Sequence, residues 1–182
     1  MIFGHLGIAA LVGSTQRDRI GSRLFIALLA ASFAPDVVDI AYFVAGICSP
    51  YGLFSHSIPA ALIEGAAIGG IALLVTDSWR IALAFLAVVL LHVPADMVTG
   101  YKILVPGGDL LGLQFYQRPL YDFVAEAAVI VTGWLAMQRA DIHIRWAVSR
   151  RVLVGLLIAQ AACDIVIAGP GLHLKPSACR AA

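Results

Sequence analysis

The chain has 182 residues, of which 61% are hydrophobic and only 13% are charged, and its mean hydropathy is +0.93. Soluble domains contain roughly 25% charged residues, so this composition predicts an integral membrane protein. The net charge is +1, and the sequence contains no basic patch interleaved with aromatic residues, so no nucleic-acid binding is indicated.

Six apolar segments follow one another along the chain: residues 1–14, 24–48, 59–76, 80–100, 121–138 and 151–169. A lipid bilayer admits only α-helices or closed barrels, and the sequence shows no period-2 alternation. The prediction is therefore an all-α, polytopic membrane helical bundle of about five to six hydrophobic helices, some short or proline-broken. Residues 1–169 are expected to form a single membrane-embedded domain, and residues 170–182 a flexible tail. The first segment lacks a basic leader, so we expect a retained short helix instead of a cleaved signal peptide.

Basic residues are concentrated in three of the connections, at 15–23, 77–80 and 139–151. These connections hold Arg17, Arg19, Arg23, Arg80, Arg139, Arg145, Arg150 and Arg151, whereas the opposite side holds Lys102, Arg118, Lys175 and Arg180. The positive-inside rule then predicts that the three connections are cytoplasmic and that both termini lie outside.

The second apolar segment contains Ala34-Pro35-Asp36-Val37-Val38-Asp39. Pro35 lacks the N–H that a continuous helix needs, so it predicts a kink or break. Asp36 and Asp39 lie about one turn apart on one face, where two carboxylates repel unless a cation or a shared proton compensates. A divalent metal is the simplest such compensation.

Two further stretches bring histidines into the membrane. Ser57 is a candidate N-cap for the helix after Phe54-Ser55-His56-Ser57, which places His56 just before that helix. His92 and Asp96 share one helix face because they are four residues apart, so both can reach one metal ion. Pro94 between them predicts a second broken helix beside a ligand.

The ionisable residues of different segments fall at a similar depth. Counted from the basic ends, His5, Asp36, His92, Glu126 and Asp164 lie roughly nine to thirteen residues in, at about 1.5 Å per residue. His56 is expected slightly above them, nearer the outer surface. Ionisable groups inside a membrane are costly and are usually functional. A shared level is what one buried polar site would require.

Structural explanations remain open for several of these residues. An isolated buried histidine such as His5 is more often a hydrogen-bonded core residue than a metal ligand. Asp122 and Glu126, four residues apart, either bind Arg118 or line the site. Glu64 and Asp164 are interpreted as structural or coupling residues, and several glycines as positions of close helix packing: Gly4, Gly7, Gly13, Gly65, Gly69 and Gly70.

The order of these motifs resembles that of the YdjM-type membrane-bound metal-dependent hydrolases. The matching residues are His5, Pro35-Asp36-Val37-Val38-Asp39, Ser55-His56-Ser57 and His92-Val93-Pro94-Ala95-Asp96, within about the first hundred positions. The resemblance implies a distant relation to zinc-dependent phospholipase C. It also implies metal ligation by Asp36, His56, His92 and Asp96, with His5 and Asp39 as additional ligands.

The expected protein is therefore a hydrolase of the bacterial cytoplasmic (inner) membrane that uses Zn²⁺, with Mn²⁺ as the alternative ion. Its expected substrate is a membrane lipid or another amphiphile, such as a phosphoester, and Asp39 or Glu126 is the candidate general base. Two alternatives stay open. One is a proton- or ion-coupled transporter that uses Asp36, His92 and Glu126 as a relay. The other is a structural membrane protein without catalysis.

Overall fold

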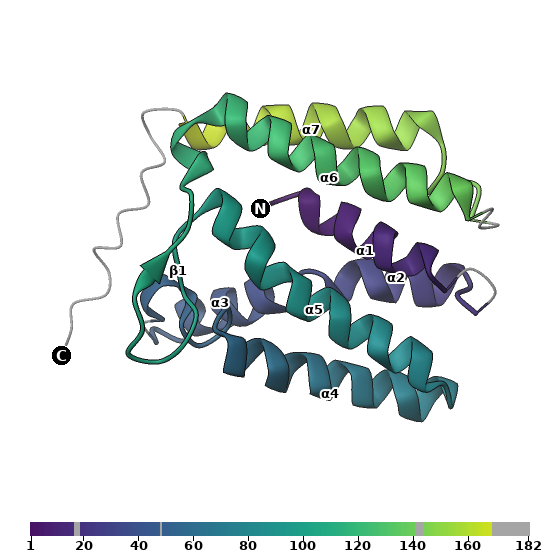
Figure 1. The fold of residues 1–182 in the computed structure, drawn as a ribbon, viewed down its shortest axis with the longest axis horizontal. Helices are drawn as coiled ribbons and strands as arrows, with labels where there is room; N and C mark the ends of the chain where they lie inside the picture. The colour runs from purple at the N-terminus through teal and green to yellow at the C-terminus, as the bar shows by residue number, and fades with distance from the viewer. Residues whose placement is uncertain (17–18, 48, 141–143, 169–182) are drawn as a thin grey trace.

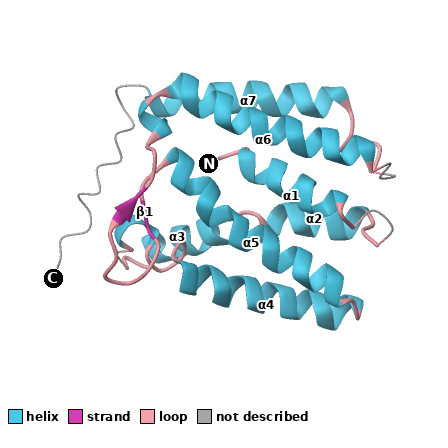
Figure 2. Ribbon diagram, viewed as in Figure 1, coloured by secondary structure: helices cyan, strands magenta, loops and turns pink. Residues whose placement is uncertain are grey.

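The computed structural model describes residues 1–16, 19–47, 49–140 and 144–168. They form a mostly helical bundle with a single two-stranded antiparallel ribbon (Figure 2). The elements in chain order are α1 (Gly4–Ser14), α2 (Ser22–Ala31), α3 (Ala34–Val44), η1 (Pro50–Gly52), α4 (Ile58–Thr76), α5 (Trp79–Thr99), β1 (Lys102–Ile103), β2 (Leu110–Leu111), η2 (Phe115–Gln117), α6 (Pro119–Arg139) and α7 (Arg150–Ala168). The tail predicted at 170–182 lies outside the described residues.

Three described helices are long and apolar enough to cross a membrane, namely α4, α5 and α6. The pair α2 and α3 forms a fourth apolar stretch that is bent by 51°. α1 is apolar but shorter, as expected for the first segment. The all-α membrane bundle predicted from the sequence is confirmed.

α1 lies inside the bundle, between α5 and α6, while α4 and α7 lie on opposite outer sides (Figure 1). The C-terminal ends of α1, α4 and α6 point to the same end of the bundle (Figure 1). The three connections rich in arginine follow these helices, so the prediction that they share one side of the bundle is confirmed. The cytoplasmic location of that side stays a prediction.

Glycines allow two helix pairs to approach closely. A Cβ atom on Gly7 of α1 would lie 2.6 Å from the carbonyl oxygen of Val129 in α6, and one on Gly69 of α4 would lie 2.9 Å from that of Ala82 in α5. Any larger residue at these positions would push the helices apart. Gly70 instead faces open space, so its assignment to helix packing was wrong.

The two prolines act differently. Pro35 lies in the first turn of α3, and the chain bends just before it, at Ser32 and Phe33. Pro94, by contrast, sits inside α5, which runs unbroken from Trp79 to Thr99. The second helix break expected at Pro94 is therefore wrong, because a single missing N–H is tolerated within a well-packed helix.

Candidate metal centre

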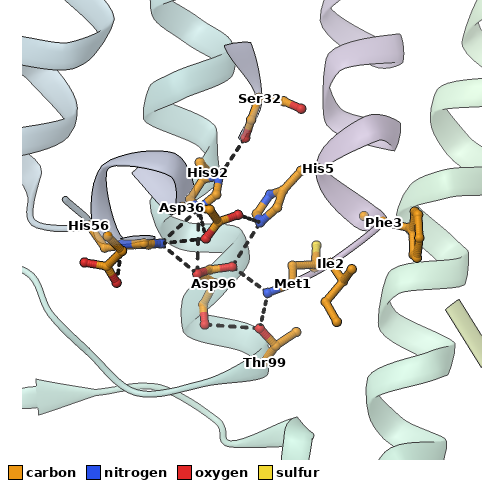
Figure 3. A network of polar contacts seen from close by, with 12 residues as sticks. Met1, Ile2, Phe3, His5, Ser32, Asp36, His56, His92, Asp96 and Thr99 are labelled. Atoms are coloured by element: carbon orange, nitrogen blue, oxygen red, sulfur yellow. Dashed lines mark hydrogen bonds and ion pairs between the residues drawn. The ribbon is translucent and has the colours of Figure 1, made fainter. Parts of the chain in front are cut away.

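Three segments of the chain bring two histidines and two aspartates together in the interior of the bundle (Figure 3). His92 and Asp96 come from one face of α5, and Asp36 from the first turn of α3. His56 comes from the segment before α4, whose N-cap is Ser57 as predicted. His56, His92 and Asp96 are buried, and Asp36 is 36% exposed along its side chain.

The potential ligand atoms of these four side chains converge on one point. His56 Nε2 lies 3.0 Å from His92 Nε2. Asp36 Oδ1 lies 3.3 Å from the former nitrogen and 3.5 Å from the latter. Asp96 Oδ2 lies 3.1 Å and 3.7 Å from the same two nitrogens. The sequence had placed His56 above the other residues, but its side chain folds inward to join them.

These spacings fit a metal ion with four protein ligands. Metal–ligand distances of about 2.0–2.1 Å in a tetrahedral site place the ligand atoms about 3.3 Å from one another. The five separations given above, 3.0–3.7 Å, bracket that value. Two imidazoles and two carboxylates form a donor set suited to Zn²⁺ and, with further oxygen ligands, to Mn²⁺.

The tautomer of His92 is set by the helix break. The carbonyl oxygen of Ser32, which lies between α2 and α3, is 2.8 Å from His92 Nδ1. A carbonyl only accepts hydrogen bonds, so Nδ1 carries the proton and a neutral imidazole presents the lone pair of Nε2 to the cluster. The bend at Pro35 thus supplies both Asp36 and the group that orients His92.

His56 is oriented by a serine and an aspartate. Ser55 Oγ donates to Asp39 Oδ1 at 2.6 Å and lies 2.7 Å from His56 Nδ1. Because the serine proton goes to the carboxylate, Nδ1–H donates to Oγ, and His56 also presents a lone pair at Nε2. Two lone pairs 3.0 Å apart require a cation or an additional proton between them.

Asp39 therefore occupies a different place from the one expected of a ligand. Its carboxylate lies on the Nδ1 side of His56, at 3.8 Å, and is not among the four groups whose donor atoms converge. The structure assigns it to the orientation of His56 through Ser55.

His5 lies directly beside the four groups. Its ring stacks on that of His92, with centroids 3.7 Å apart and an interplanar angle of 11°. His5 Nε2 is 3.1 Å from Asp96 Oδ1 and 3.9 Å from Asp36 Oδ2. A carboxylate only accepts hydrogen bonds, so His5 Nε2 carries the proton and the lone pair lies at the buried Nδ1, which has no hydrogen-bond partner among the described residues.

Two positively charged groups contact Asp96, and the sequence pattern gave no signal for either. Lys102 Nζ of β1 is 2.9 Å from Asp96 Oδ2. The Met1 nitrogen is 2.5 Å from Asp96 Oδ1 (Figure 3). The Met1 nitrogen also donates to Tyr116 Oη at 2.6 Å. Burial, reinforced by the negative charge of Asp96, raises the pKa of the Tyr116 phenol, which therefore stays protonated.

Glu126, the other candidate general base, lies away from the four groups. Its carboxylate accepts hydrogen bonds from the backbone N–H groups of Ile2 and Gly4, at 2.8–2.9 Å, and so caps the start of α1. It belongs instead to a second acidic group with Asp122 and Asp164. The ion pair considered between Asp122 and Arg118 is not formed, because the Arg118 guanidinium lies over the Tyr121 ring.

Comparisons of the chain with protein-family models, curated proteins and solved structures find no match.

Proposed function

We propose that this protein is a membrane-embedded, metal-dependent hydrolase of the YdjM type that resides in the bacterial cytoplasmic membrane. The observation that carries the proposal is the convergence of donor atoms from Asp36, His56, His92 and Asp96. Both histidines in this set are held by hydrogen bonds at Nδ1, which leaves Nε2 to bind a metal.

These four side chains would hold the divalent ion, with Zn²⁺ favoured by the two imidazoles. When bound, such an ion supplies Lewis acidity for a phosphoryl or acyl oxygen and lowers the pKa of water toward about 7. The chain contributes ligand orientation: the Ser32 carbonyl fixes His92, and the Asp39–Ser55 pair fixes His56.

The proton acceptor is proposed to be His5 instead of Asp39 or Glu126. His5 is not one of the four convergent groups, and its Nε2–H donates to Asp96 Oδ1 at 3.1 Å, because a carboxylate only accepts hydrogen bonds. The lone pair that can take a proton is therefore at the buried Nδ1, which has no hydrogen-bond partner among the described residues. Asp39 faces the opposite nitrogen of His56, and Glu126 accepts hydrogen bonds from the backbone N–H groups of Ile2 and Gly4. A general base must first lie within hydrogen-bond distance of the proton that it removes.

Support for an amphiphilic substrate comes from α3. Asp36 is the most exposed of the four groups, so the centre is reached along this helix. The remaining surface of α3 is apolar, with Val37, Ile40, Phe43 and Val44 between 60% and 79% exposed. A lipid would lie against this surface, and the Lys102 ammonium beside Asp96 favours an anionic headgroup such as a phosphoester.

The test is turnover of phosphoester lipids in detergent micelles by zinc-loaded protein. Asp96→Asn is expected to abolish both zinc binding and turnover. Asp77→Asn is the matched control, because Asp77 lies in the exposed α4–α5 turn with φ 50°, a conformation that asparagine tolerates. Full turnover by Asp96→Asn, or lipid flux in proteoliposomes without any hydrolysis, would contradict the proposal and favour a transporter.

A further inference from the structure

A second cluster of ionisable side chains lies between α6 and α7. Asp122 and Glu126 come from adjacent turns of α6, and Asp164 comes from α7. One carboxylate oxygen of each lies within 4.8 Å of the others, and the three residues are 1%, 0% and 4% exposed. None of the three belongs to the histidine-containing centre.

The hydrogen bonds among the described residues leave two carboxylate oxygens of this cluster without a donor. Glu126 accepts from the backbone N–H groups of Ile2 and Gly4, and Asp164 Oδ1 accepts from Gln160 Nε2 at 2.6 Å. Asp122 Oδ1 and Asp164 Oδ2 are buried and accept from no donor among these residues. A buried acceptor without a partner costs about 1–3 kcal/mol, and more when it is charged.

Electrostatics requires a compensating charge at the same place. Three carboxylates this close, deep in a bundle, repel one another unless protons or a cation lie among them. A donor set made only of carboxylate oxygens prefers hard cations, in contrast to the imidazole-containing centre. The two unpartnered oxygens, one from each helix, are where such an ion would find its ligands.

We propose that Asp122, Glu126 and Asp164 bind a second divalent cation, of the class of Mg²⁺, Ca²⁺ and Mn²⁺. The ion joins α6 to α7 and, through Glu126, to the start of α1. The short segment of residues 1–4 then links the two centres, since Met1 contacts Asp96 while Ile2 and Gly4 contact Glu126. This site does not depend on the hydrolase proposal.

The test is a Mn²⁺ titration, followed by electron paramagnetic resonance, of detergent-purified protein whose first centre is loaded with zinc. Wild type is expected to bind one Mn²⁺, which Mg²⁺ or Ca²⁺ displaces. Asp122→Asn/Asp164→Asn should weaken this binding by about 100-fold while zinc stays bound. The His92→Ala/Asp96→Ala variant should lose zinc and still bind Mn²⁺ at the second site. Undiminished Mn²⁺ binding by the Asp122/Asp164 variant overturns the proposal.

A measurement on the wild type guards against a variant that does not fold. Adding Mn²⁺ or Ca²⁺ to zinc-loaded protein should raise its melting temperature, because a ligand that binds only the folded state stabilises it by mass action. No shift with any of the three cations, together with an infrared band of a protonated carboxylic acid, would overturn the proposal and assign the cluster to shared protons.

Discussion

Ser55→Ala tests the hydrogen bonds that orient His56. The substitution removes the hydroxyl that lies 2.7 Å from His56 Nδ1 and 2.6 Å from Asp39 Oδ1. Asp39 Oδ2 lies 3.8 Å from the same nitrogen, which is too far for a hydrogen bond. Ser55 and His56 are both buried, so water does not readily replace the lost partner.

The expected loss in metal affinity follows from the role of this pair. Removing a hydrogen-bond partner of a metal-binding histidine weakens metal binding by about 10–100-fold, or about 1.4–2.7 kcal/mol. The assay is competition for Zn²⁺ between the detergent-purified protein and a chromophoric chelator. Unfolding would also become easier by about 1–3 kcal/mol, because a buried N–H is left unpaired.

Ser57→Ala is the matched control, two residues away. It removes the N-cap hydroxyl of α4, which accepts from Ala60 N at 3.4 Å and makes no hydrogen bond to the His56 ring. Its expected effect is a stability loss of about 1 kcal/mol with unchanged zinc affinity. A zinc affinity of Ser55→Ala indistinguishable from wild type would refute the assignment of Asp39 and Ser55 as orienting residues.

Two further predictions concern packing and charge. Gly7→Ala should lower the unfolding free energy by about 1–3 kcal/mol, because its Cβ would meet the Val129 carbonyl. Thermal melting measures this change. Gly70 faces open space, so the control Gly70→Ala is expected to melt like wild type. Lys102→Met should tighten zinc binding about tenfold, since the ammonium repels a cation near Asp96. Chelator competition measures this change, and weaker zinc binding would contradict it.

Much of the fold could be predicted because the bilayer restricts the answer to helices. Each of the six apolar segments corresponds to a helix or, for residues 24–48, to the bent pair α2 and α3. The bend at Pro35 was predicted from its missing N–H, whereas the break at Pro94 did not occur. Both prolines lack the backbone N–H, yet only Pro35 lies at a bend, because the packing of α5 against its neighbours cannot be inferred from the local sequence.

Depth counting brought together most of the cluster but could not resolve orientation. The count placed His5, Asp36, His92, Glu126 and Asp164 at one level, and the structure brings the first three together. Glu126 and Asp164 instead join Asp122 in a second group. Asp39 shares a helix face with Asp36, yet its side chain reaches Ser55 instead of the centre. The Ser32 carbonyl and the Lys102 side chain belong to no sequence motif, because backbone groups and residues outside the predicted helices enter a site only through the tertiary fold.

The central claim is that the four convergent side chains bind a metal ion. The most direct test is elemental analysis of detergent-purified wild type beside the His92→Ala/Asp96→Ala variant. Near-stoichiometric zinc or manganese in the wild type, absent from a folded variant, is the predicted result. Wild-type protein that is folded and binds no divalent ion, even after reconstitution with zinc and manganese, would contradict the claim and leave the cluster a structural network.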